Sequence, residues 1–332
     1  MTVTKEKLPL AAGAGAVAVG GAVAATKVVR DRVAERTERR ERAYRLQPGE
    51  DLAEGIRRIA RGQVDLARDE LQGGGDAGAS VHEARKAFKR QRALLRLVRD
   101  EIGDDVYRRE NATYRGLGRA LAGARDAEVI AQALDAVVER AGDEIPDGTF
   151  AGLREVLEGE ARDADDRLGD QPDVIGRVVA MLGNARLRID AWPLPTGDDT
   201  APLAPGLRRI YRRGRRAWRA AEKHTDTEHL HELRKRAKDL WHAGQIARPA
   251  SPKKLRKISR RAHDLSDVVG EDHDLAVLLD AAAEREHVLA PGERELLASL
   301  VGARRAELQH EALERARRLY SRKPRKVAGL VT

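Results

Sequence analysis

Two stretches of this 332-residue chain repeat each other, and the repeat limits the folds that the chain can adopt. The segment "VHEARKAFK", which begins at Val81, and the segment "LHELRKRAK", which begins at Leu230, share five residues at matched positions, 231 − 82 = 149 residues apart. Farther along, "LAGARDAEVI" from Leu121 aligns with "VGEDHDLAVL" from Val269 at an offset of 274 − 126 = 148. Two matched pairs at nearly one offset indicate a duplicated unit.

The repeated unit is predicted to be helical. Ala, Leu, Arg and Glu dominate, aromatic residues make up 3% of the chain, and the alternation of apolar and polar residues typical of strands is missing. We therefore predict an all-α fold of two helix bundles related by a pseudo-twofold axis. Glycine and proline predict the breaks between helices, at Gly73–Gly75, Gly103, Gly142–Gly148, Gly169–Pro172, Gly270 and Pro291–Gly292. The absence of cysteine excludes disulfides and thiolate sites.

The chain is predicted to have one helical domain between two tails. Residues 1–43 form an Ala/Gly-rich tail and a charged connector, residues 44–322 form the domain, and residues 323–332 form a basic tail. Four prolines within residues 191–206 make a crossover between a first half, 44–190, and a second half, 207–322. Residues 8–26 are uncharged and long enough to cross a bilayer, but they are mostly Ala and Gly. A disordered or loosely helical tail is favoured there over a membrane helix or a signal peptide.

Charges of opposite sign are segregated along the sequence. Pro205 to Ala262 holds 19 Lys and Arg against 5 Asp and Glu, whereas Asp126 to Asp173 holds 4 Arg against 15 Asp and Glu. Charges that served only solubility would be mixed. The segregation therefore predicts a strong local field directed at an anionic partner.

On a helix, the repeated cations fall beside the apolar face rather than opposite to it. In the first copy, His82, Arg85, Lys89, Arg92, Arg96 and Arg99 form a stripe next to the apolar residues, and in the second copy His231, Arg234 and Lys238 do the same. Two such stripes predict one shared electropositive groove. Further cations expected there are Arg115, Arg119, Arg125, Arg208, Arg212, Arg215, Arg219, Lys253, Arg256, Lys257, Arg260 and Arg261.

The groove needs an anion, water or counter-charges, because several like charges beside a core are costly without them. Single-stranded nucleic acid is usually held by aromatic side chains as well as charge, and this chain has few. No motif for reading duplex DNA is apparent. A linear chain of phosphates needs only charge and hydrogen-bond donors, so it fits the groove better than nucleic acid does.

These motifs resemble the CHAD family, the conserved histidine α-helical domain. The resemblance rests on "VHEARKAFKRQR" with "RALAGARDAEV", repeated as "LHELRKRAKDL" with "DVVGEDHDLAV", and on the opening "YRLQPGEDLAEGIRRIA". It covers roughly Tyr44 to Tyr320 and implies two four-helix bundles around a basic central pore that binds inorganic polyphosphate, in proteins that can associate with polyphosphate granules. The family's histidines correspond to His82 and His231, their basic followers to Arg85, Lys89, Arg234 and Lys238, and the aspartates of the second motif to Asp126 and Asp274. The chain departs from the pattern with Ala122 opposite Gly270, and with His273 opposite Arg125.

The sequence favours a binding protein over an enzyme. We expect no catalysis, no cofactor and no metal, because the segment around His231 lacks the second histidine of a zinc motif and no nucleotide-binding loop is visible. Phosphotransfer through His82 or His231 and architectural binding of nucleic acid remain alternatives. We expect a cytoplasmic protein associated with polyphosphate granules, with membrane contact through residues 8–26 as an open alternative.

Overall fold

The computed structural model describes residues 39–73, 76–121, 126–169 and 172–332. The chain divides into two compact units, Met1–Ala43 and Tyr44–Thr332. In the first unit only residues 39–43 are described, and they are helical. Residues 8–26 and Arg125, for which the sequence makes predictions, lie outside the described residues. The fold and the site below belong to Tyr44–Thr332.

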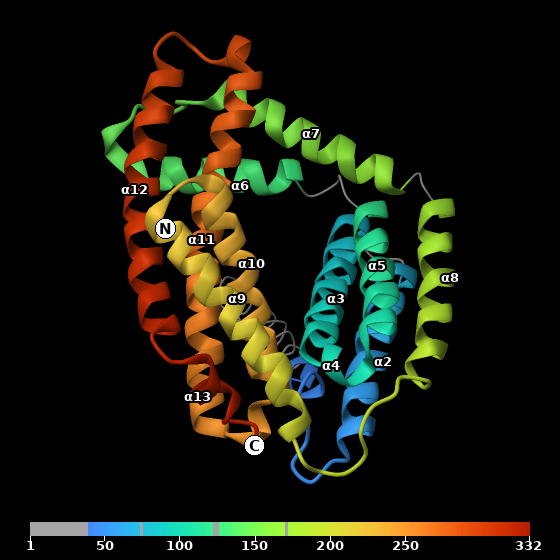
Figure 1. Cartoon of the computed structure of the whole chain (residues 1–332). Helices are drawn as coiled ribbons and strands as arrows, with labels where there is room; N and C mark the ends of the chain where they lie inside the picture. Colours follow the sequence, from blue (N-terminus) through green and yellow to red (C-terminus); the bar gives the residue numbers. More distant parts are fainter. Residues whose placement is uncertain (1–38, 74–75, 122–125, 170–171) are drawn as a thin grey trace, which may run out of the picture. The chain divides into compact units, whose positions relative to one another are not determined.

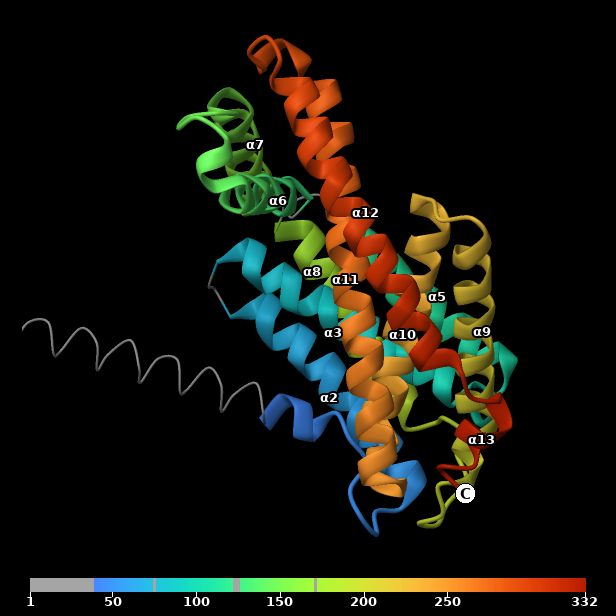
Figure 2. The same cartoon turned by 90° about the vertical axis from the view of Figure 1, so that its left-hand side faces the viewer.

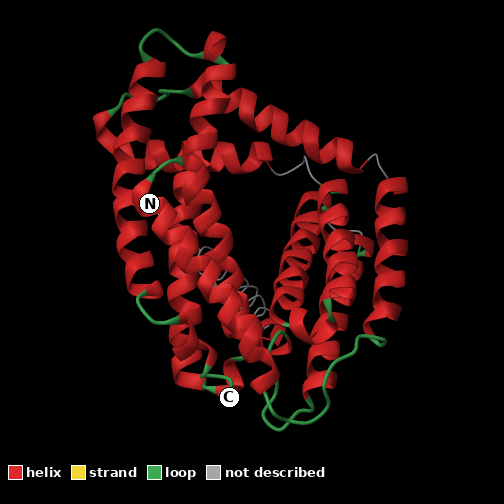
Figure 3. Cartoon of the chain, in the orientation of Figure 1, coloured by secondary structure: helices red, strands yellow, loops and turns green. Residues whose placement is uncertain are grey.

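The described part of Tyr44–Thr332 consists of helices joined by turns, without a strand, as Figure 3 shows, and this confirms the predicted all-α class. The α-helices are α2 (Leu52–Gln72), α3 (Ala77–Leu97), α4 (Arg99–Ile102), α5 (Asp104–Ala120), α6 (Asp126–Ala141), α7 (Ala151–Gly169), α8 (Pro172–Ile189), α9 (Ala204–Lys223), α10 (Thr227–Ile246), α11 (Pro252–Glu284), α12 (Glu293–Tyr320) and α13 (Pro324–Ala328). Short 3₁₀ helices are η1 (Gly142–Glu144), η2 (Ala201–Leu203), η3 (Arg248–Ala250) and η4 (Glu286–Val288).

Helices α3 and α10, which carry the two copies of the histidine motif, begin with the same kind of cap. The Asp76 carboxylate accepts a hydrogen bond from the Ala79 N–H at 3.0 Å, and the Asp226 carboxylate accepts one from the His229 N–H at 2.9 Å. Each bond satisfies an N–H group that the first turn of a helix leaves without a partner. The caps therefore place both repeated histidines in the second turn of their helices.

The helices have the same order of neighbours in both halves of the chain. In the first half, α2 packs against α3 and α8, and α3 packs against α5. In the second half, α9 packs against α10 and α12, and α10 packs against α11 (Figure 1). A duplicated unit predicts this repeated order, whereas the pseudo-twofold arrangement of two four-helix bundles stays a prediction.

The hydrophobic core does not divide at the crossover between the halves. Its larger part joins α2, α3, α5 and α8 with α9, α10 and the first half of α11, and includes Leu94, Trp192 and Tyr211. A second cluster joins α6 and α7 to α11 and α12, which run alongside each other in Figure 2, and includes Leu134, Leu153 and Leu278. Helices α6 and α7 thus belong to the first half by sequence and pack on the second half.

Two segments differ from the sequence-based prediction. Gly270 does not break a helix, because α11 runs through it from Pro252 to Glu284. The last ten residues, predicted as a basic tail, include α13, which packs against α9. Val327 within α13 and Val331 beyond it are both buried. The Thr200 hydroxyl donates a hydrogen bond to the Val331 carbonyl oxygen at 2.7 Å. Apolar residues between the basic ones hold this end of the chain in place.

Candidate anion-binding site

The two helices that carry the histidine motifs contact each other. An ion pair joins them: an Arg96 guanidinium nitrogen on α3 lies 3.2 Å from a carboxylate oxygen of Asp239 on α10. Asp239 is buried and also receives a hydrogen bond from Arg236 at 2.9 Å. The stripes of the two copies, far apart in sequence, therefore meet in the folded chain, as the sequence predicts.

Lys238 lies where these stripes meet. Its pKa falls to about 8, chiefly because burial disfavours the charged ammonium. The positive charges of Arg234 and Lys89 lower the pKa further, and Lys89 comes from the other copy. Asp267 and Asp274 on α11 raise it, without offsetting the decrease. Lys238 is thus crowded by cations from both halves of the chain.

Two more arginines show the same crowding. Burial lowers the pKa of Arg92 on α3, and the charges of Arg96 and Arg115 lower it further. Burial likewise lowers the pKa of Arg213 on α9, with Arg236 adding to the effect. We call the following set the central cluster: the cations Lys89, Arg92, Arg96, Arg213, Arg234, Arg236 and Lys238, with the carboxylates Asp239, Asp267 and Asp274. Its cations outnumber its carboxylates.

Two imidazoles lie at the α11 side of the central cluster. The rings of His231 and His273 have centroids 4.6 Å apart. Burial lowers the pKa of His231 to about 4, with smaller contributions from nearby cations, and burial also lowers the pKa of His273. Both rings are therefore neutral at pH 7 and offer hydrogen-bonding nitrogens rather than charge.

Three nitrogens at this end lack hydrogen-bond partners among the described residues. They are Nε of Arg234, Nδ1 of His231 and Nδ1 of His273, and all three are buried. A buried polar atom without a partner is costly unless a ligand or water satisfies it. Asp274 completes the group, and burial raises the pKa of its carboxyl while Arg234 opposes the rise.

A pocket of about 980 Å³ between α6, α11 and α12 opens beside the same arginine. Arg234 and Asp274 contribute to its wall. Its remaining arginines are paired: Arg304 lies 2.7 Å from Glu271, and Arg140 lies 2.7 Å from Glu307. These ion pairs make the pocket a poor place for a polyanion.

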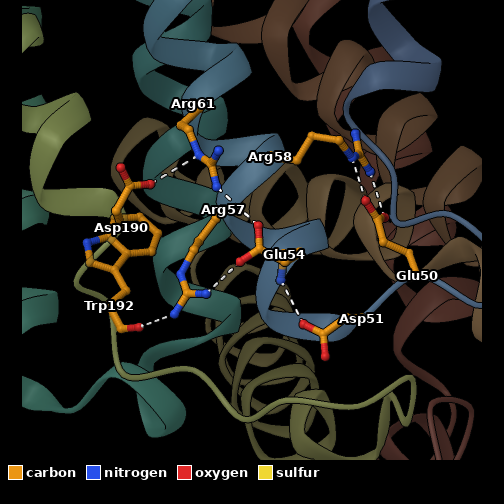
Figure 4. Close-up of polar contacts among 8 residues, drawn as sticks. All are labelled: Glu50, Asp51, Glu54, Arg57, Arg58, Arg61, Asp190 and Trp192. Carbon is orange, nitrogen blue, oxygen red and sulfur yellow. Dashed lines mark hydrogen bonds and ion pairs between the residues drawn. The ribbon is translucent and has the colours of Figure 1, made fainter.

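Arginines on the outer face of α2 contrast with the central cluster (Figure 4). The Arg58 guanidinium donates two hydrogen bonds to the Glu50 carboxylate, at 2.6 and 2.8 Å. Arg57 donates to Glu54 at 2.8 Å and to the Trp192 carbonyl oxygen at 2.9 Å. Arg61 lies within 3.3 Å of both Glu54 and Asp190. Here each cation has a carboxylate partner.

The structure brings together many of the residues predicted for the groove. Lys89, Arg92, Arg96, Arg115, His231, Arg234, Lys238 and Asp274 are linked by the interactions above. His82 and Arg85 lie half-buried on α3, Asp126 is the first residue of α6, and Arg119 is exposed near the end of α5. Exposed positions on the first half of α11 are occupied by Lys253, Arg256, Lys257, Arg260 and Arg261. Arg119 and the five α11 cations are not members of the central cluster as defined above.

On α9 the structure places a different stripe toward the cluster from the one predicted. Arg213 faces Arg236 and Asp239, and Arg209 donates a hydrogen bond to the Arg96 carbonyl oxygen at 2.8 Å. Arg215 lies instead near Tyr211, whose hydroxyl accepts a hydrogen bond from the Arg322 N–H. The helical spacing puts Arg208, Arg212 and Arg219 on the same face as Arg215. These three side chains are exposed, as is that of Arg213, so the two stripes differ in their neighbours and not in their exposure.

Sequence reasoning missed Arg213, Arg236 and His273. The apolar face of α9 has arginines along both of its borders, so periodicity alone does not say which border faces α3 and α10. Arg236 aligns with Ala87 in the first copy, so the repeat gives no signal for it. His273 stands where the first copy has Arg125, and that mismatch was the available signal.

The described residues contain no group of three or more His, Cys, Asp and Glu side chains that could hold a metal ion. Within the same residues, no helix is both long and apolar enough to span a membrane. Among known families, the CHAD domain matches residues 58–283, which is more than half of the chain. No curated protein sequence matches the chain.

Proposed function

The chain belongs to the CHAD domain family, and from this premise we propose that it binds inorganic polyphosphate at the central cluster without catalysing a reaction. The observation that carries the proposal is the contact between α3 and α10, which brings the two basic stripes together at the half-buried Lys238. Burial lowers the pKa of this ammonium, and the charges of Arg234 and Lys89 lower it further. Repulsion between these crowded cations destabilises the free protein, and a bound polyanion relieves that repulsion. Granule association is part of the same proposal, because a granule presents many such chains.

A linear phosphate chain suits the composition of the cluster. Its phosphoryl oxygens accept charge-assisted hydrogen bonds from arginine and lysine, which are stronger than bonds between neutral groups. The neutral His231 and His273 rings add hydrogen-bonding nitrogens that do not increase the crowding of charge. Stacking surfaces for bases are not required, and the helices α3, α9 and α10 contribute cations rather than aromatic side chains to the cluster.

The test is a pair of triple variants with the same change in charge. In the first, Lys89, Arg213 and Lys238 are replaced by alanine, which removes central cations from three helices. In the control, Arg208, Arg212 and Arg219 are replaced, which removes the exposed stripe of α9. We expect the first variant to lose about a hundredfold or more in affinity for long-chain polyphosphate, because each charge-assisted bond contributes about 1.5–3 kcal/mol. The control should lose less than about threefold.

Binding is measured by titration over a series of salt concentrations, with circular dichroism to verify that both variants stay helical. Equal losses in the two variants would mean that polyphosphate responds to total charge and not to the cluster. Duplex DNA and RNA are titrated at the same concentration of phosphate groups and over the same salt series. The salt series is needed because the affinity of nucleic acids for cationic side chains also depends on salt. Displacement of polyphosphate by either would identify a nucleic acid as the partner.

The absence of catalysis is tested in the same samples. Polyphosphate chain length should remain unchanged after incubation with the protein, with and without Mg²⁺. Phosphotransfer would instead leave acid-labile phosphate on a histidine after incubation with a phosphodonor. Either shortened chains or a phosphorylated His82 or His231 would replace the binding function by an enzymatic one.

A further inference from the structure

Gly270 lies in the interior of the long helix α11, where its sequence predicts a break. Glycine in a helix interior costs stability relative to alanine, because its backbone loses more freedom on folding. No turn or positive φ angle requires glycine at this position, since the helix continues for fourteen residues beyond it, to Glu284. Another feature of the fold must therefore account for it.

That feature is the guanidinium group of Arg234, which lies against the bare backbone of α11. A Cβ atom added at Gly270 would be 2.9 Å from one terminal guanidinium nitrogen, 3.1 Å from Nε and 3.3 Å from the central carbon of Arg234. All three atoms belong to the flexible end of one side chain from α10. An added methyl group would move the guanidinium and leave the two helix backbones where they are.

The position of Arg234 matters because other groups of the site depend on it. Burial is the main cause of the lowered pKa values of His231 and His273, and the charge of Arg234 adds to it in both. The same charge opposes the rise in the pKa of Asp274 that burial causes. The Nε of Arg234 and the Nδ1 atoms of the two histidines are among the buried nitrogens that lack partners within the described residues. A displaced guanidinium would therefore change both the charge near the two imidazoles and the set of nitrogens open to a ligand.

We propose that Gly270 is a positioning residue of the polyphosphate site: its missing side chain leaves the space in which Arg234 lies, so that Arg234, His231 and His273 face one phosphoryl group together. The role of this group rests on the proposed function, but the placement of Arg234 does not. The aligned position of the first copy holds Ala122, so glycine is present at one of the two positions.

The test is Gly270→Ala, with Gly302→Ala as the matched control. Gly302 is also inside a long helix, α12, but an added Cβ there meets nothing within 4 Å. We expect Gly270→Ala to lose about tenfold in polyphosphate affinity, which corresponds to one strong hydrogen bond. Its melting temperature should stay at or above that of the wild type. Gly302→Ala should bind normally.

A double-mutant cycle separates positioning from a general effect on structure. If the methyl group acts by displacing the guanidinium, Gly270→Ala has no further effect on binding once Arg234 is alanine. Additive losses would overturn the proposal. If Gly270→Ala lowers the melting temperature, the added Arg234→Ala substitution should restore it, because the three atoms nearest to the new methyl group are then gone.

A measurement without ligand tests the positioning role of Gly270 independently of polyphosphate binding. Titration of His231 and His273 by NMR should show higher pKa values in Gly270→Ala than in the wild type, shifted toward the values of Arg234→Ala, because the guanidinium has moved. Unchanged values would overturn the positioning role even if polyphosphate binds. A shift in a protein that binds no polyphosphate would keep the positioning role and overturn the proposed function.

Discussion

Replacement of Gly206 by alanine is expected to destabilise the protein by about 3 kcal/mol or more, the upper end of the range for overpacking. The added Cβ would overlap the Leu97 carbonyl oxygen, and it would lie 2.7 Å from the carbonyl carbon and 3.2 Å from Cα of the same residue. These atoms are backbone at the end of α3, so neither helix yields by rotating a side chain. Helix α9 must therefore move away from α3.

Denaturant unfolding of Gly206→Ala beside Gly302→Ala measures this effect. The control adds a methyl group in open space on α12 and should be neutral or slightly stabilising. A loss below about 1 kcal/mol in Gly206→Ala would show that α9 does not begin against α3. The contact matters for the site, because Arg213 reaches the central cluster from α9.

Polyphosphate affinity is expected to fall about tenfold between pH 7 and pH 9, because Lys238 loses its proton in the free protein over this interval. The pKa of Lys238 is about 8 when the site is empty, with burial as the main cause. A bound polyanion favours the ammonium and raises this pKa, so binding takes up a proton. Internal phosphates keep their charge throughout.

Calorimetric titrations in buffers with different ionisation enthalpies measure the proton uptake directly. Lys238→Arg is the control, since arginine stays charged at pH 9. The pH dependence should be much flatter in this variant. An equal decrease in the wild type and in Lys238→Arg would assign the titration to another group. The groups that act on Lys238 are Lys89 from α3, Arg234 from α10, and Asp267 and Asp274 from α11.

In the absence of ligand, the contribution of Lys238 to the free energy of unfolding should increase as the pH rises, whereas polyphosphate affinity decreases. Between a pKa of about 8 in the folded protein and the ordinary lysine value of 10.5, the unfolded chain binds more protons than the folded one at Lys238. This group alone therefore makes folding more favourable as the pH rises through that window. Comparison with Lys238→Arg isolates its contribution from those of other titrating groups.

The repeat and the helical periodicity predict most of the helices and the meeting of Lys89 with Lys238. Both follow from local pattern: an apolar stripe must be buried, so the cations beside it are carried to the edge of the core. Gly270 shows the limit of this reasoning. As a local signal it predicts a break, and its actual neighbour, Arg234, is 36 residues away in sequence and only becomes its neighbour through packing.

The choice between the two basic borders of α9 could not be predicted for a related reason. Arg209 and Arg213 face α3 and α10 because α9 begins against the backbone of Leu97, and this contact depends on the absence of a side chain at Gly206. Helical spacing alone treats both borders as equal. The structure adds the rotation of the helix, which decides which arginines join the cluster.

The ion pair between Arg96 and Asp239 joins residues that are made at very different times during synthesis. Because a chain emerges from the ribosome from its N-terminus, α3 with its cations is complete long before Asp239, Asp267 and Asp274 have been made. During that interval Arg96 lacks the carboxylate with which it pairs in the folded protein. The contact between α3 and α10 therefore forms only after both copies of the histidine motif have been made.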